Sequence, residues 1–128
     1  MVTTPDAILL PSVENSIVPS LELTDLDADR RLLELPGTSL LIFTSTGCAS
    51  CRWTRRKLPV MNLSIDRLCW VDAGTNGGLV QRYEVFHLPS LFLVRDGHFL
   101  GSLQCPLDRS GLSAGLQQAI DRSPEELP

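Results

Sequence analysis

The chain alternates between short apolar runs of strand length and longer segments whose apolar residues recur at helical spacing. We predict strands at residues 21–24, 39–44, 68–72, 91–94 and 98–103. We predict helices at residues 26–35, 49–57 and 79–83, and a last helix with the apolar stripe Leu112, Leu116, Ala119 and Ile120. The run at 39–44 is apolar nearly throughout, which is typical of a central strand covered on both faces. The order βαβαβαββα predicts an α/β domain with a central mixed sheet and helices on both faces.

Local signals indicate how these elements end and connect. Beyond the second helix, a further helical piece is expected to reach residue 63 or 67. Asp96-Gly97 is a strong signal for a hairpin that joins the last two strands. Either Asp108 or Ser110 caps the last helix. The chain should therefore combine parallel crossovers with one antiparallel hairpin near its end.

Length and composition indicate one domain with an extension at each end. The chain has 128 residues and 43% apolar content, enough for one core and too little for two ordinary domains. We predict an N-terminal extension over residues 1–20, a domain over residues 21–122 and a frayed C-terminal tail over residues 123–128. No apolar run approaches the roughly 20 residues that cross a bilayer. The first ten residues lack the charged start of a secretory signal, so we expect a cytoplasmic protein.

The charges are distributed unevenly along the chain. The net charge of -4 argues against general affinity for nucleic acids or anionic membranes, because both select an excess of basic residues. Residues 36–64 contain no acid, and this section holds the basic cluster Arg52, Arg55, Arg56 and Lys57. The cluster either attracts acidic partners or is an ordinary solvated helix face, and in both cases its field favours a nearby thiolate.

Two cysteines lie where a predicted strand is followed by a predicted helix. Cys48 and Cys51 are separated by two residues, so both sulfurs lie within bonding reach across one helical turn, and the helix N-terminus stabilises the first thiolate. We predict that Cys48 is the exposed nucleophile, with a lowered pKa, and that Cys51 is the resolving thiol. Ser50 either hydrogen-bonds the thiolate or caps the helix. Trp53 is expected to belong to the core.

The string Leu40-Leu41-Ile42-Phe43 leading to Cys48-Ala49-Ser50-Cys51-Arg52 opens a pattern that continues along the chain. Its later parts are Val71-Asp72, Tyr83-Glu84-Val85, Leu88-Pro89-Ser90-Leu91 and Arg95-Asp96-Gly97. The pattern resembles the thioredoxin family over residues 21–122. The resemblance implies the thioredoxin fold, a redox-active dithiol and a cis peptide bond before Pro89 that faces the dithiol. It also implies that an extended substrate binds at Gly47, Ala49, Ser50, Leu88 and Pro89.

Three positions depart from the family pattern. The family usually has a buried acid six residues before the first cysteine, where it moves a proton to or from the second cysteine; Ile42 occupies that place. The usual tryptophan before the first cysteine is Gly47, and the usual Gly-Pro between the cysteines is Ala49-Ser50. The proton relay is therefore missing, whereas the nucleophile is intact.

The other cysteines and the two histidines lie apart from one another in the sequence. Cys69 lies in a predicted strand and is expected to be a core residue. In the family alignment, Cys105 takes the place of a groove glycine, where it either forms an alternative disulfide with Cys48 or is an inert buried thiol. One Cys-x-x-Cys motif is only half of a tetrahedral zinc site, and neither His87 nor His98 has partner spacing. We expect no metal and no cofactor.

The sequence favours a thiol-disulfide oxidoreductase that exchanges electrons between the dithiol of Cys48 and Cys51 and disulfide-containing protein substrates, acting as a reductant. A thioredoxin-reductase-type donor or a small thiol would supply the electrons. The alternative is a thioredoxin-fold adaptor or assembly factor that binds a protein partner with little redox turnover. The missing acid at Ile42 and the long N-terminal segment keep that alternative open.

Overall fold

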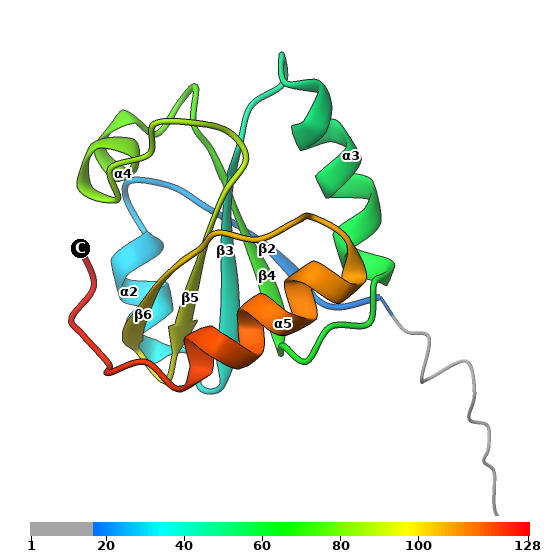
Figure 1. Ribbon diagram of the computed structural model, residues 1–128. Helices are drawn as coiled ribbons and strands as arrows, with labels where there is room; N and C mark the ends of the chain where they lie inside the picture. The colour runs from blue at the N-terminus through cyan, green and yellow to red at the C-terminus, as the bar shows by residue number, and fades with distance from the viewer. Residues whose placement is uncertain (1–16) are drawn as a thin grey trace, which may run out of the picture.

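The computed structural model describes residues 17–128, so most of the expected N-terminal extension lies outside the described residues (Figure 1). The strands of this part are β2 (Ser20–Leu23), β3 (Thr38–Thr44), β4 (Arg67–Asp72), β5 (Ser90–Arg95) and β6 (His98–Leu103). The helices are α2 (Ala28–Glu34), α3 (Ala49–Lys57), α4 (Gly77–Arg82) and α5 (Arg109–Ile120), with the short 3₁₀ helix η1 (Leu58–Val60) after α3. This is the βαβαβαββα order that the hydrophobic pattern predicts.

The strands form one mixed sheet in the order β2-β4-β3-β5-β6. β4 pairs in parallel with β2 and β3, whereas β5 pairs antiparallel with β3 and β6. The central strand β3 is buried at all seven positions, as expected for a strand covered on both faces. The predicted α/β class and mixed sheet are therefore confirmed.

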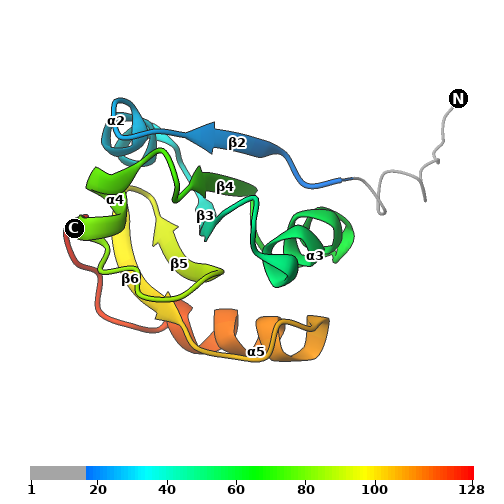
Figure 2. The same ribbon diagram turned by 90° about the horizontal axis from the view of Figure 1, so that it is seen from above.

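Helices cover both faces of the sheet (Figure 2). The side chains of β3 alternate between the faces with the period of two of a strand. Leu40 and Ile42 pack in one apolar cluster with residues of η1 and α5, and Leu41 and Phe43 pack in the other with residues of α2 and α4. Each large apolar side chain fully buried in this way contributes roughly 1.5–3 kcal/mol to folding. Two separate cores thus hold β3 in place between the helices.

The connections agree with the sequence at the hairpin and differ from it after α3. Asp96 and Gly97 both have positive φ angles, 52° and 80°, which is the geometry that an Asp-Gly hairpin turn requires. The expected helical continuation beyond α3 is wrong, because only η1 forms there. Asn62 has a φ of 62°, and a residue in this left-handed region cannot continue a right-handed helix. Asp108 caps α5, where its carboxylate accepts a hydrogen bond from the Gly111 backbone.

The expected fraying of the last residues is wrong. Phe99 and Glu125 exchange two backbone hydrogen bonds, of 2.8 and 2.9 Å, and Leu127 packs against the apolar cluster on the α2 side. Arg122 donates to the carbonyl oxygens of Leu100 and Ser102. The C-terminal segment therefore covers part of the open edge of β6, which otherwise presents unpaired backbone groups.

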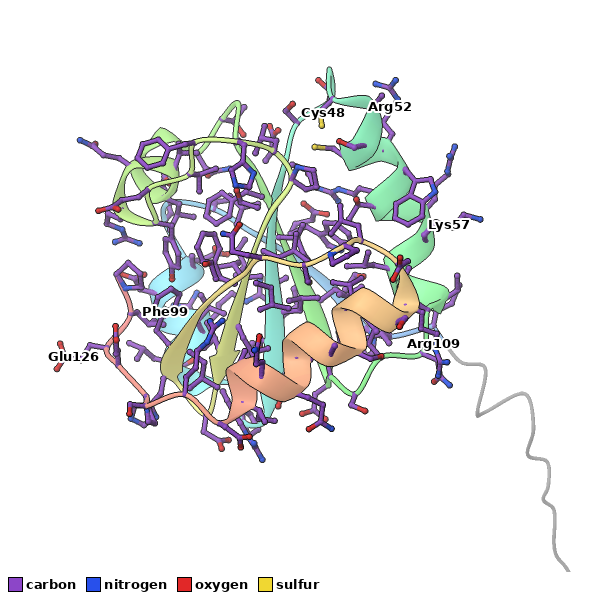
Figure 3. The ribbon with its side chains drawn as sticks, in the orientation of Figure 1. Cys48, Arg52, Lys57, Phe99, Arg109 and Glu126 are labelled. Atoms are coloured by element: carbon purple, nitrogen blue, oxygen red, sulfur yellow. The ribbon has the colours of Figure 1, made fainter. Side chains whose placement is uncertain are left out.

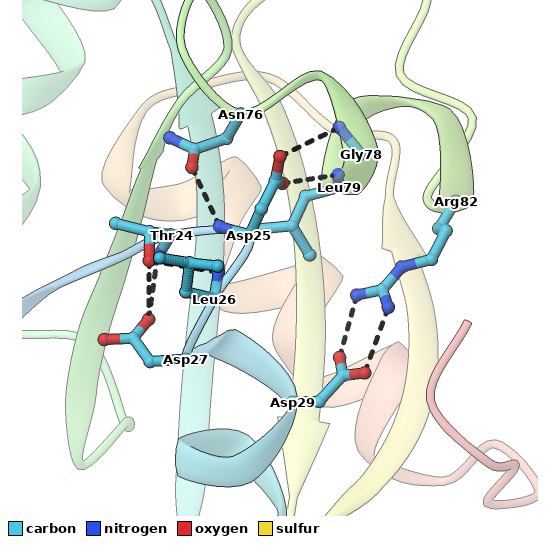
Figure 4. Close-up of polar contacts among 9 residues, drawn as sticks. All are labelled: Thr24, Asp25, Leu26, Asp27, Asp29, Asn76, Gly78, Leu79 and Arg82. Carbon is cyan, nitrogen blue, oxygen red and sulfur yellow. Dashed lines mark hydrogen bonds and ion pairs between the residues drawn. The ribbon is translucent and has the colours of Figure 1, made fainter.

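A group of polar contacts fixes α4 against the β2–α2 connection (Figure 4). The Asp25 carboxylate accepts hydrogen bonds from the backbone nitrogens of Gly78, at 3.1 Å, and Leu79, at 2.8 Å. These donors lie in the first turn of α4, where no intrahelical partner exists. Arg82, at the other end of α4, donates two hydrogen bonds to the carboxylate of Asp29 and forms an ion pair with it. Both ends of a helix of only six residues are thereby fastened.

None of the helices in residues 17–128 is long and apolar enough to span a membrane.

We predict that Asp25→Ala destabilises the domain by about 1 kcal/mol, the usual cost of losing a helix-capping side chain. The physical reason is that the two amides of Gly78 and Leu79 lose their acceptor. Urea denaturation followed by circular dichroism measures the free energy of unfolding. Asp121→Ala is the control, because Asp121 is exposed and caps no helix N-terminus. Equal stabilities of the two variants would contradict the role assigned to Asp25.

Candidate active site

The dithiol lies where β3 ends and α3 begins. Cys48 is the N-cap residue of α3, with φ −103° and ψ 115°, and its sulfur accepts a hydrogen bond from the Cys51 backbone nitrogen at 3.2 Å. A sulfur in this position interacts with the positive end of the helix dipole. Figure 3 shows Cys48 at the start of α3, with Arg52 and Lys57 further along the helix. Cys51 lies within the first turn and is 1% exposed, whereas Cys48 is half-buried.

The surroundings lower the pKa of Cys48. The largest cause is its hydrogen bond with the Cys51 thiol, followed by that with the Ser50 hydroxyl, whose oxygen lies 3.3 Å from the Cys48 sulfur. The direction of this pKa shift agrees with the expectation from the sequence, but the groups that cause it are not the expected ones. Arg52, expected to favour the thiolate, directs its guanidinium to the carbonyl oxygen of Thr46 at 3.0 Å. Ser50 thus hydrogen-bonds the Cys48 sulfur, and the N-cap is Cys48 itself.

The surroundings act in the opposite direction on Cys51, whose pKa is raised to about 11. Burial is the largest cause, because it removes water from the charged form, and the hydrogen bond with Cys48 comes next. A backbone hydrogen bond at Ser45 and the charge of Arg55 oppose the increase. As the pH rises, Cys48 therefore ionises before Cys51, which keeps its proton at neutral pH.

The loop before β5 approaches the Cys48 sulfur. The Leu88–Pro89 peptide bond is cis, as the resemblance implies, and the carbonyl oxygen of Leu88 lies 3.8 Å from the Cys48 sulfur. Leu88 and Pro89 are half-buried, and Gly47 and Ala49 are exposed beside Cys48 in the sequence. The structure thus brings the Leu88 backbone close to the Cys48 sulfur.

Three other predicted positions differ in their burial. Cys69 is completely buried in β4, as expected. Cys105 is half-buried, and its sulfur would lie 2.9 Å from a Cβ added at Gly115, so it faces α5. Burial raises the pKa of the Cys105 thiol, which makes it a poor nucleophile at neutral pH. The expectation that Trp53 is a core residue is wrong, because it is half-buried and belongs to neither apolar cluster.

One residue near the dithiol escaped the sequence reasoning. Arg55 was part of the basic cluster, yet its charge acts directly on Cys51. Its position four residues after Cys51 was the available signal, because residues at this spacing share a helix face. Within residues 17–128, no three histidine, cysteine or acidic side chains gather closely enough to hold a metal ion.

Comparison with known proteins identifies the fold. No protein-family profile matches the sequence, and no curated protein matches it. Solved structures do match. The thioredoxin-like domain of Arabidopsis NCP (nuclear control of PEP activity) superposes with a TM-score of 0.71 at 17% identity, over 91% of this chain and 94% of that one. A mutant thioredoxin from Halobacterium salinarum superposes with a TM-score of 0.67 at 19% identity, over 85% and 97% of the two chains.

The zinc-bound form of human ERp44 also matches, with a TM-score of 0.63 at 18% identity. The match covers 80% of this chain but only 30% of ERp44, so the chain corresponds to less than a third of that protein. At these identities the likeness concerns the fold. The chain has the thioredoxin fold, as its sequence pattern indicates.

We predict that Cys48 reacts with iodoacetamide at a rate that rises around a pH below about 8.5, the ordinary thiol value. A lowered pKa means that thiolate is already present below that pH, and the reactivity falls only when the pH drops through the lowered value. Ser50→Ala removes one hydrogen bond to the thiolate and should shift this midpoint upward. Peptide mass spectrometry after timed labelling measures the rate at Cys48 alone.

Ser110→Ala is the control for this measurement, because Ser110 is an exposed residue of the first turn of α5. A parent midpoint at or above about 8.5, or an equal midpoint in Ser50→Ala and the parent, would contradict the assignment.

Proposed function

We propose that this protein is a thiol-disulfide oxidoreductase that passes two electrons from Cys48 and Cys51 to disulfides of protein partners. The observation that carries the proposal is the opposite effect of the surroundings on two neighbouring thiols. The pKa of Cys48 is lowered, and that of Cys51 is raised to about 11. In such a pair, one thiolate can attack a substrate while the other thiol stays protonated until the second exchange.

The reaction consists of two exchanges. The Cys48 thiolate attacks one sulfur of the substrate disulfide, that disulfide bond breaks, and the other substrate cysteine leaves as a thiolate that takes a proton from water. Cys51 then loses its proton and attacks the Cys48 sulfur. The Cys48–Cys51 disulfide forms, the mixed disulfide breaks, and the second substrate cysteine leaves. The substrate gains two electrons, and the protein loses two.

Substrate binding would use the backbone beside the nucleophile. The carbonyl oxygen of Leu88, 3.8 Å from the Cys48 sulfur, is placed to accept a hydrogen bond from an extended peptide. Gly47, Ala49, Ser50 and Pro89 would complete the contact surface. Two of the structures with this fold are described as a thioredoxin and a thioredoxin-like domain, which supports this class of activity.

The proposed direction is reduction of the substrate in a cytoplasmic setting. A thioredoxin-reductase-type protein or a small thiol would return the electrons to the Cys48–Cys51 disulfide. The hydrogen bonds to the Cys48 sulfur favour its thiolate, the form that attacks a substrate disulfide.

A second candidate is a thioredoxin-fold adaptor. Phe86 is 86% exposed on the loop that leads to Leu88, and such a side chain suits a protein contact. Ile42, completely buried where the resemblance places an acid, removes one aid to turnover. An adaptor would bind its partner equally well without a thiol at position 48.

We predict that Cys48→Ser abolishes dithiothreitol-dependent reduction of a protein disulfide, because the attacking sulfur is absent. Cys51→Ser should instead accumulate a mixed disulfide with the substrate, because the first exchange proceeds and the second cannot. Turbidity of the reduced substrate measures the turnover, and non-reducing gel electrophoresis measures the trapped complex.

Cys105→Ser is the matched control and should retain turnover, since the Cys105 sulfur faces α5. Turnover that survives in Cys48→Ser contradicts the oxidoreductase proposal. Unchanged binding of a captured partner in the same variant would favour the adaptor.

A further inference from the structure

A cavity of about 290 Å³ lies beside Cys51, between the first turns of α3 and the ends of β3 and β4. Its walls include Thr44, Ser45, Thr46, Cys51, Arg55 and Asp72. Cys51 itself is only 1% exposed, so its thiol borders this space while remaining almost fully covered. The cavity offers a route between the buried thiol and solvent.

Arg55 is held at the wall of this cavity by side chains from three strands. Its guanidinium carbon lies 4.5 Å from the ring centroid of Trp70 in β4. Its Nε and one terminal nitrogen each lie 3.4 Å from the Thr44 hydroxyl in β3, and it forms an ion pair with Glu22 in β2. A planar guanidinium suits this combination of stacking and hydrogen bonding. The positive charge is therefore kept at one place rather than free in solvent.

Four charged or ionisable groups act on the Cys51 thiol or line the cavity beside it. Cys48 and Arg55 lie on α3 with it, and the pKa of Cys51 responds to both. Arg52 lies on the same helix, but its guanidinium is bound to the Thr46 carbonyl oxygen. Asp72 of β4 lines the cavity, and its carboxylate accepts a hydrogen bond from the Thr75 hydroxyl at 2.8 Å. Of the two cations, Arg55 is the one whose charge opposes the effect of burial on Cys51.

We propose that Arg55 is a positioning residue for the second exchange: its fixed guanidinium stabilises the Cys51 thiolate as it forms, and the proton leaves through the adjacent cavity. This inference rests on the proposed oxidoreductase function. In this step the S–H bond of Cys51 breaks and the proton passes to water. The Cys51–Cys48 bond forms, the bond from Cys48 to the substrate sulfur breaks, and the departing substrate thiolate takes a proton from solvent.

In this proposal, Arg55 and solvent together replace the buried acid that the family pattern has at the position of Ile42. Ile42 is completely buried in the apolar cluster, so it neither accepts nor donates a proton. Arg55 does not accept a proton either, because a guanidinium stays charged at all ordinary pH values. It instead lowers the free energy of the ionised sulfur, and solvent in the cavity serves as the acceptor.

The test separates the two exchanges with dithiobis(nitrobenzoate), an aromatic disulfide that releases one coloured thiolate in each. The full chain carries Cys105→Ser and is mixed in reduced form with one equivalent of reagent in a stopped-flow instrument. The first phase of colour reports the attack by Cys48. The second phase reports the attack by Cys51, and its rate is recorded against pH.

We predict that Arg55→Gln moves the pH midpoint of the second phase upward by about one unit, which slows this phase about tenfold below the midpoint. The first phase should change less than twofold. Arg55→Lys keeps the charge and should recover part of the rate. Glu22→Gln removes the ion pair but leaves the guanidinium on Trp70 and Thr44, so it should slow the second phase less than Arg55→Gln does. Arg56→Gln is the control for an exposed arginine on the same helix.

An unchanged second phase in Arg55→Gln, or equal slowing by Arg56→Gln, overturns the inference. If Arg55→Gln does not fold, Thr44→Val takes its place, because it removes the hydroxyl that holds Arg55 while nearly preserving the side-chain shape. It should slow the second phase about threefold, and an unchanged rate overturns the inference. A parent protein that releases no second thiolate refutes the proposed function itself, which distinguishes the two failures.

Discussion

The functional geometry depends on one junction, where the buried strand β3 stops and α3 begins. β3 is buried along its whole length and is held by apolar clusters on both faces, so its end has a defined position. The chain then turns, and Cys48 caps the helix with its sulfur on the Cys51 amide. Because the capping sulfur meets the positive end of the helix, the thiolate is stabilised by a feature that the fold needs in any case.

The second partner of the site comes from a distant part of the chain. β5 pairs antiparallel with β3, so the start of β5 lies beside the end of β3, and the Leu88 carbonyl oxygen reaches the Cys48 sulfur. The contacts of Asp25 and Asp29 hold α4, which precedes this loop. Polar contacts remote from the sulfurs thereby hold the helix that leads into the loop beside Cys48.

Much of the fold followed from the hydrophobic pattern, since local periodicity reports burial directly. The limits of α3 and the turn at Asp96-Gly97 were predicted from such local signals. The pairing of Glu125 with Phe99 was not, because a bridge between distant backbone groups leaves no periodic trace. The half-buried position of Trp53 was missed for a related reason, because helical spacing does not say which neighbours complete the core.

The sequence by itself determined the dithiol and its place at a helix start, since these depend on spacing and on backbone chemistry. Its resemblance to a known family indicated the proline beside the dithiol. Only the tertiary structure decided in which direction the pKa of each thiol shifts. Burial of Cys51, the hydroxyl of Ser50 beside Cys48, and the stacking of Arg55 on Trp70 all depend on side chains meeting in three dimensions. Electrostatic effects on a thiol act over a few ångströms of space, and a one-dimensional pattern carries no such distances.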